Sequence, residues 1–139
     1  MGTEAEEEEP VSKYMLLDRL FRFIETKEDE RVNAVLAGYF SRVVCLLINR
    51  KQKQVVPYIF SEERSVVELL LKHVYSRSVA EVLNRLLNII ETNFDGEELP
   101  ALIAGKKQQI VSSLIEQLRG EQDQETALNA QFILADIME

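Results

Sequence analysis

The sequence contains a single cysteine, a single histidine and no tryptophan. One cysteine excludes a disulfide framework, and one cysteine with one histidine excludes a Cys/His zinc cluster. Five glycines and three prolines are too few for a collagen-like or proline-rich chain, and for most all-β folds. No apolar run approaches the roughly 20 residues of a membrane-spanning helix. We therefore expect a soluble helical protein without a membrane partner, located in the cytoplasm, with the nucleus as the alternative.

Acidic residues are unevenly distributed along the chain, whose formal net charge is −8. Five of them lie near the N-terminus: Glu4, Glu6, Glu7, Glu8 and Glu9. Because such a run repels itself and offers almost nothing to bury, we expect residues 1–10 to form a disordered acidic tail. The remainder, 11–139, is expected to form a single helical domain.

A basic segment without acidic residues lies between Arg31 and Ser61. Its basic residues are Arg31, Arg42, Arg50, Lys51 and Lys53. The segment is either a solvated face of a helix or a docking surface for an acidic partner. Nucleic acid is disfavoured as that partner, because phosphate-binding domains usually carry a net positive charge.

Apolar residues recur at three- and four-residue intervals along nearly the whole chain, a spacing that predicts helices. Seven or eight helices are predicted, over about residues 13–24, 32–48, 54–60, 65–74, 78–91, 100–105, 107–119 and 124–137. The stripe on the second helix is so wide that we expect it to be central to the core. Its members are Val32, Val35, Leu36, Tyr39, Phe40, Val43, Val44, Leu47 and Ile48.

Capping residues predict where several of these helices begin. Ser12 and Asp123 are predicted N-caps, because their side-chain oxygens can accept hydrogen bonds from free backbone N–H groups. Ser78 with Glu81 fits the reciprocal capping box.

Proline and glycine predict interruptions. Pro57 lacks the N–H that a helix interior needs, which weakens the predicted helix 54–60. Pro100 suits the first turn of a short helix that Gly105 would close, and Gly120 would end the helix after it. Short loops make consecutive helices antiparallel neighbours. Two all-α architectures therefore remain open: a compact helical bundle and an α-solenoid of the HEAT or armadillo kind.

No motif for catalysis or for a cofactor is present: there is no GxGxxG, Walker loop, HExxH or GxSxG. His73 lies near a predicted helix C-terminus, where a structural or partner-contacting role is expected. Cys45 lies within an apolar helix, where a free cysteine behaves as a small buried hydrophobe and is chemically inert. We therefore expect the protein to be neither an enzyme nor a cofactor-binding protein.

Four short motifs follow one another over residues 16–91: LAGYFSRV (36–43), INRKQKQVV (48–56), LLLKHV (69–74) and LNRLL (83–87). In this order and spacing they resemble the SAPS family. Its members are regulatory subunits of type-2A-like serine/threonine phosphatases of the type-6 branch. Tyr75 stands where that family usually has Gly.

The resemblance implies an all-α HEAT/armadillo-like superhelix of which this chain is one segment. It also implies a non-catalytic scaffold that binds a type-6-like phosphatase catalytic subunit, helps direct substrate choice and contacts further regulatory subunits. The polar residues that match family positions are the candidate partner-binding residues: Arg42, Arg50, Lys51, Gln54, Lys72, His73 and Arg85.

Two alternatives to a phosphatase subunit stay open from the residues themselves. One is an unrelated helical-repeat adaptor that binds a peptide in its groove. The other is an oligomerising helical bundle in which broad apolar faces meet those of a second copy.

Overall fold

The computed structural model describes residues 14–27, 30–120 and 123–137. Within these ranges all regular structure is helical and no strand is present, which confirms the all-α prediction. The helices are α2 (Met15–Phe21), α3 (Ala34–Arg50), α4 (Gln52–Phe60), α5 (Val66–Lys72), α6 (Arg77–Leu87), α7 (Glu98–Arg119) and α8 (Gln124–Ile137), with short 3₁₀ helices η1 (Arg22–Ile24) and η2 (Glu91–Asn93). The predicted tail 1–10 and the predicted cap Ser12 lie outside the described residues.

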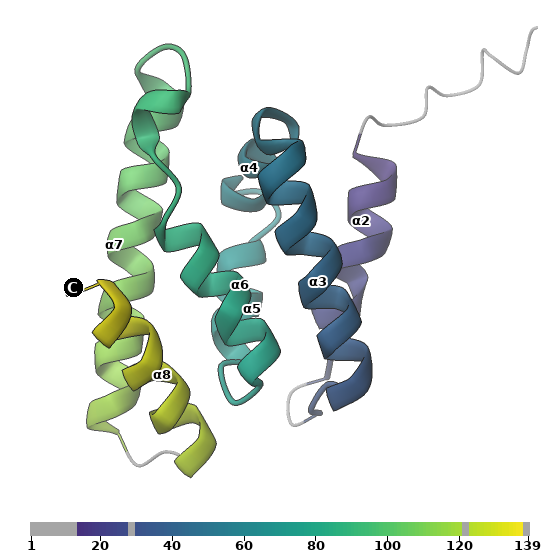
Figure 1. Cartoon of the computed structure of the whole chain (residues 1–139), viewed down its shortest axis with the longest axis vertical. Coiled ribbons are helices and arrows are strands. Elements are labelled where there is room, and N and C mark those ends of the chain that lie inside the picture. Colours follow the sequence, from purple (N-terminus) through teal and green to yellow (C-terminus); the bar gives the residue numbers. More distant parts are fainter. Residues whose placement is uncertain (1–13, 28–29, 121–122, 138–139) are drawn as a thin grey trace, which may run out of the picture.

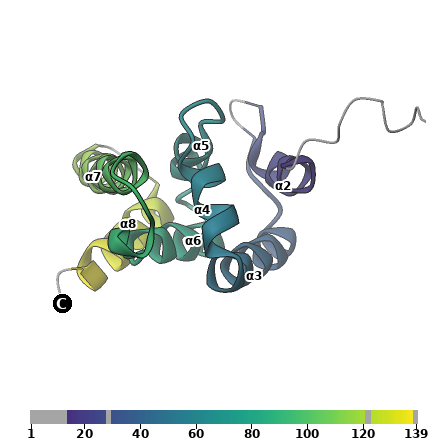
Figure 2. The same ribbon diagram turned by 90° about the horizontal axis from the view of Figure 1, so that it is seen from above.

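The helices stack side by side as pairs (Figure 1). Helix α2 leads into α3, the α4–α5 segment leads into α6, and α7 leads into α8. Helices α3, α6 and α8 form one layer, while α2, α4, α5 and α7 lie on its other side (Figure 2). The most extensive contacts join α3 to α6, α6 to α8 and α7 to α8. This packing is consistent with the HEAT/armadillo-like prediction, and three pairs of this size also satisfy the description of a compact bundle.

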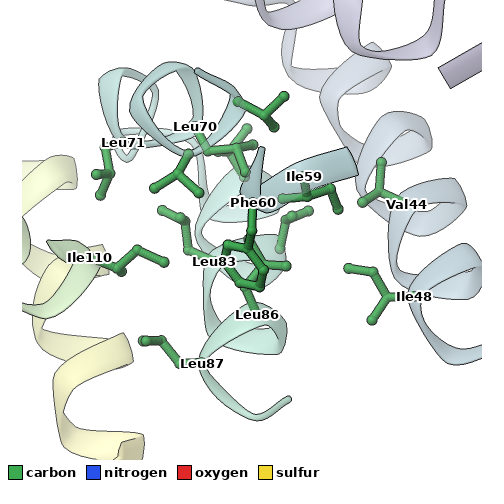
Figure 3. Packing of buried hydrophobic residues seen from close by; sticks show 14 of the residues in the cluster. Val44, Ile48, Ile59, Phe60, Leu70, Leu71, Leu83, Leu86, Leu87 and Ile110 are labelled. Atoms are coloured by element: carbon green, nitrogen blue, oxygen red, sulfur yellow. The ribbon is translucent and has the colours of Figure 1, made fainter. Parts of the chain in front are cut away.

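The core lies between the two layers (Figure 3). Phe60 of α4 and Leu83 of α6 are fully buried at its centre. Val44 contributes from α3 and Ile110 from α7, and both are also fully buried. Large apolar side chains from four helices thus meet in one cluster, and the removal of their surface from water is the main stabilising term.

Helix α6 begins two residues earlier than a capping box at Ser78 requires. The N-cap is Ser76, whose side chain accepts a hydrogen bond from the backbone N–H of Val79. The capping-box prediction for Ser78 and Glu81 is therefore wrong. The local sequence offers two serines two positions apart, and the first of them is the N-cap.

Helix α7 runs without interruption from Glu98 to Arg119, so the prediction that Gly105 closes a short helix is wrong. A mid-helix glycine costs about 1 kcal/mol relative to alanine. Burial of Ile103 and Ile110 on either side of it outweighs that cost. Helix α4 likewise contains Pro57 in its interior rather than being broken by it.

Two predicted helix ends are confirmed. The side chain of Asp123 accepts a hydrogen bond from the backbone N–H of Thr126 at the start of α8. Gly120 is the C-cap of α7.

Helix α3 only partly fits the prediction of a central core helix. One side of it, which includes Phe40, Val44 and Ile48, is buried. The other side carries apolar side chains that are between 43% and 65% exposed: Val35, Leu36, Tyr39, Val43 and Leu46. We refer to these five residues as the α3 face. The prediction was wrong for Val35, Leu36, Tyr39 and Val43, and it did not include Leu46. Sequence periodicity shows how wide a stripe is but not how many neighbours the helix has.

Candidate docking surface

The seven candidate partner-binding residues come from three separate places in the fold. Arg42 and Arg85 lie on either side of the contact between α3 and α6. A second group, Arg50, Lys51 and Gln54, lies at the junction of α3 and α4, whereas Lys72 and His73 lie at the end of α5. The α3–α4 junction and the end of α5 are at opposite ends of the layers (Figure 1). The seven residues therefore do not form a single patch.

His73 is fully buried, so it is not available to a partner at the surface. Its Nε2 lies 3.0 Å from the backbone oxygen of Ile24, and its Nδ1 lies 2.7 Å from the hydroxyl of Tyr75. That hydroxyl accepts a hydrogen bond from the backbone N–H of Val32 at 2.8 Å. These partners suit a neutral ring with its proton on Nε2. Burial lowers the pKa of His73, which also favours the neutral form.

Lys72 is exposed but already engaged. Its Nζ donates to the backbone oxygens of Thr26 and Lys27, at 3.2 and 3.4 Å. Lys72 and His73 thus fasten the end of α5 to the segment that leads into α3. Their contacts are structural, and Tyr75 contributes to them from the position where the resembling family usually has glycine.

A surface groove of about 460 Å³ runs along the contact between α3 and α6, with Arg42 and Arg85 among its lining residues. Arg85 donates a hydrogen bond across it to the side chain of Asn49. The side-chain oxygen of Asn84 is buried in the same region and has no hydrogen-bond partner among the described residues. Cys45 also lines the groove and is half-buried, and this burial raises the pKa of its thiol. A protonated thiol is a poor nucleophile, in agreement with the inert role expected for Cys45.

The basic side chains of the α3–α4 junction are free for a partner. Arg50, Lys51 and Gln54 are exposed, and within the described residues none of them forms an ion pair or a side-chain hydrogen bond. Arg42 is exposed and unpaired in the same sense. Free charges at fixed positions on a helical scaffold can steer and orient an acidic partner.

The α3 face is the part of the surface that reasoning from the sequence missed. It lies on the same helix as Arg42 and Arg50. The signal was present, since the apolar stripe of α3 is wider than one packing contact needs. Contiguous exposed apolar residues next to unpaired charges are typical of protein–protein interfaces.

Potential metal ligands are not clustered in the part of the chain that the structure describes. There, no group of three or more His, Cys, Asp or Glu side chains could hold a metal ion. None of the described helices combines the length and hydropathy that crossing a membrane requires. What the described surface offers is a set of free basic side chains, an adjoining apolar face and a shallow groove.

Comparison with known proteins gives one family and a consistent set of relatives. The family model described as SIT4 phosphatase-associated protein matches residues 44–139. Serine/threonine-protein phosphatase 6 regulatory subunit 1 of Mus musculus is 33% identical over 123 residues, which are 88% of this chain and 14% of the relative. Regulatory subunit 3-A of Xenopus laevis is 31% identical over the same share of each chain.

A third relative, serine/threonine-protein phosphatase 6 regulatory subunit 2 of Homo sapiens, is 28% identical over 88% of this chain and 12% of its own length. The chain thus spans about one seventh of the length of the curated relatives that it matches. No solved structure matches it.

Proposed function

Because the chain belongs to the SIT4 phosphatase-associated protein family, we propose that it is part of a non-catalytic regulatory subunit of a type-6 serine/threonine phosphatase. In this role it binds the catalytic subunit, helps to direct substrate choice and contacts further regulatory subunits. The observation that carries the proposal is the family match over residues 44–139, together with relatives that are named regulatory subunits. A cytoplasmic location, with the nucleus as the alternative, is part of the proposal.

Among the residues suggested by the sequence, Arg42, Arg50 and Lys51 are the best candidates for contacts with the catalytic subunit. They are exposed and unpaired among the described residues, so a partner gains their charge without first breaking an internal ion pair. Gln54 extends this surface along α4, and Arg85 flanks it across the groove. His73 and Lys72 support the surface indirectly, by fastening the segment before α3.

The proposal is tested by charge reversal at the α3–α4 junction. Exchanging Arg50 and Lys51 for Glu should weaken binding to a purified type-6 phosphatase catalytic subunit by about tenfold or more, which corresponds to about 1.4 kcal/mol or more. The melting temperature should change little, because substitutions at exposed, unpaired positions are usually worth within about 0.5 kcal/mol. Binding is measured by surface plasmon resonance at several salt concentrations.

The matched control reverses charge in the turn between α4 and α5, outside the basic surface. Glu62 and Glu63 are exposed, and neither side chain forms an ion pair within the described residues. Exchanging both for Lys should leave the affinity unchanged. If the wild-type chain and the Arg50/Lys51 reversal bind the catalytic subunit with equal affinity, the basic surface is not part of the interface. The proposed function itself would be contradicted if the complete regulatory subunit that contains this chain did not bind the catalytic subunit.

A further inference from the structure

The α3 face follows the spacing with which two helices pack alongside each other. Leu36, Tyr39, Val43 and Leu46 are separated by three, four and three residues, and Arg50 occupies the next position in the same sequence of steps. This is the a/d pattern of a heptad. Side chains at these positions form one seam along a helix, onto which a second helix packs at a crossing angle of about 20°.

The seam is available in the described structure. Its four apolar members are between 43% and 57% exposed. Isolated exposed apolar residues need no explanation, but a contiguous row of them marks an interaction site. Tyr39 lies near the middle of the row, and tyrosine is among the residues that most often dominate binding energy at interfaces.

Basic residues lie beside the seam at one position and at its C-terminal end. Arg42 immediately precedes Val43 and so occupies a flanking position, while Arg50 lies at the end of the seam. Neither side chain forms an ion pair with another described residue, although Glu81 of α6 lines the same groove as Arg42. A helix that covers the seam therefore gains most if it carries acidic residues along its edges.

Two occupants from the sequence in hand fit the seam poorly, one because of its charge and the other because of its lack of apolar side chains. A second copy that packed its own α3 face on this one in register would bring Arg42 or Arg50 near the same arginine of the first copy, which is repulsive. The acidic stretch Glu4–Glu9 has the required charge but contains no large apolar side chain to fill the seam. An occupant that fits this seam therefore combines an apolar row with acidic residues placed opposite Arg42 and Arg50.

We propose that the α3 face is the docking site for an amphipathic α-helix of a partner protein, with an apolar heptad seam flanked by acidic residues. The seam of α3 buries the partner's apolar row, and Arg42 and Arg50 pair with its carboxylates. The inference goes beyond the proposed function, because it states the chemistry of the bound element and holds whichever protein supplies it.

The probe is a synthetic peptide of about three heptads with Leu at a and d and Glu at e and g, whose like charges prevent it from pairing with itself. A second peptide carries Lys in place of every Glu. Each is labelled with a fluorophore and titrated with the 139-residue chain while anisotropy is recorded. The acidic peptide should bind, the basic peptide should not, and binding should weaken as salt is raised.

Matched variants separate the seam from general surface stickiness. Val43→Gln with Leu46→Gln removes apolar side chains that are 43% and 51% exposed. The control is Ile115→Gln with Ile90→Gln, at positions that are 43% and 56% exposed and lie outside α3. The first pair should weaken binding of the acidic peptide about tenfold or more, whereas the control pair should leave it unchanged. Thermal melts of both variants serve to check that the fold is retained.

A charge exchange tests orientation. Arg42→Glu with Arg50→Glu should abolish binding of the acidic peptide and create binding of the basic one. The inference is overturned if the wild-type chain binds neither peptide, binds both equally, or loses nothing on substitution of Val43 and Leu46. No phosphatase is present in this assay, so its outcome is independent of the test of the proposed function.

Discussion

Helices α3 and α6 are neighbours in one layer, yet they use their apolar residues differently. In α6 the apolar positions are buried, including Val79, Val82 and Leu83. In α3 one apolar side is buried and a second, the α3 face, is exposed.

The difference follows from position in the layer. Helix α6 lies between α3 and α8 and also packs on α5 and α7. Among the described elements α3 is the first helix of its layer, with α6 as its neighbour on one side (Figure 2). Apolar content therefore shows what a helix can bury, whereas the number of neighbours determines what it does bury. The surplus on α3 is what makes it a candidate for intermolecular docking.

The largest expected effect comes from truncating one leucine in each helix. Leu83→Ala in α6 removes a fully buried side chain and should lower the free energy of unfolding by about 2–5 kcal/mol. Leu46→Ala in α3 removes a side chain that is 51% exposed and should cost less than about 1 kcal/mol. Urea unfolding followed by circular dichroism measures both values. Equal losses would mean that the α3 face is buried in solution.

A smaller effect is expected from the polar contacts that fasten the segment before α3. Burial lowers the pKa of His73 in the folded state, so the unfolded state binds more protons as the pH falls. Stability should therefore decrease as the pH falls below the usual histidine value of 6.5, until the folded-state pKa is reached. The slope should be at most about 1.4 kcal/mol per pH unit.

The His73 effect is isolated by comparing variants. His73→Gln can still donate to the oxygen of Ile24 but does not titrate, so its stability should be flat between pH 7 and pH 5. Tyr75→Phe keeps the imidazole of His73, so its free energy of unfolding should still depend on pH in this range. The carboxyl groups of Asp18, Glu68, Glu91 and Asp123 also have lowered pKa values in the folded state. Their contribution to stability is lost as the pH falls through and below their ordinary pKa values of 3.8 and 4.5, which is mostly below pH 5. If the stability of His73→Gln depends on pH as strongly as that of the wild type, the pH dependence comes from a group other than His73.

The smallest expected effect concerns the N-caps of the two helices. Asn33 accepts a hydrogen bond from the N–H of Leu36 at the start of α3, and Ser76 accepts one from Val79 at the start of α6. Replacing either cap with Ala should cost about 1 kcal/mol. Ser78→Ala should cost almost nothing, because Ser78 is already inside α6. Thermal unfolding measures the stability of the three variants. A larger loss of stability for Ser78→Ala than for Ser76→Ala would mean that Ser78 is the N-cap after all.

Helix type, helix order and the inward residues of the later helices could be predicted from the sequence. The apolar period of α6 and the caps around Asp123 and Gly120 depend on residues close together in the chain, so local rules were sufficient. Local rules failed at Gly105 and at Ser78. At Gly105 the cost of a mid-helix glycine was outweighed by burial of Ile103 and Ile110, whereas at the start of α6 the nearby Ser76 is the N-cap instead of Ser78.

The candidate docking surface was predicted less completely than the fold. The sequence showed that Arg42, Arg50 and Lys51 are basic residues on a segment without acids, and they are exposed. It could not show that His73 is buried, because its partner Ile24 lies 49 positions away along the chain. It also could not distinguish the two apolar sides of α3.

The sequence by itself determined an all-helical chain, because the 3.6-residue period of apolar side chains is a local property. The motifs also indicated the family, because the order and spacing of short motifs can be read directly from the sequence. The tertiary structure alone decided which polar residues are internal and which apolar residues stay exposed. Burial depends on neighbours brought together from distant positions, and for α3 those neighbours cover only one of its two apolar sides.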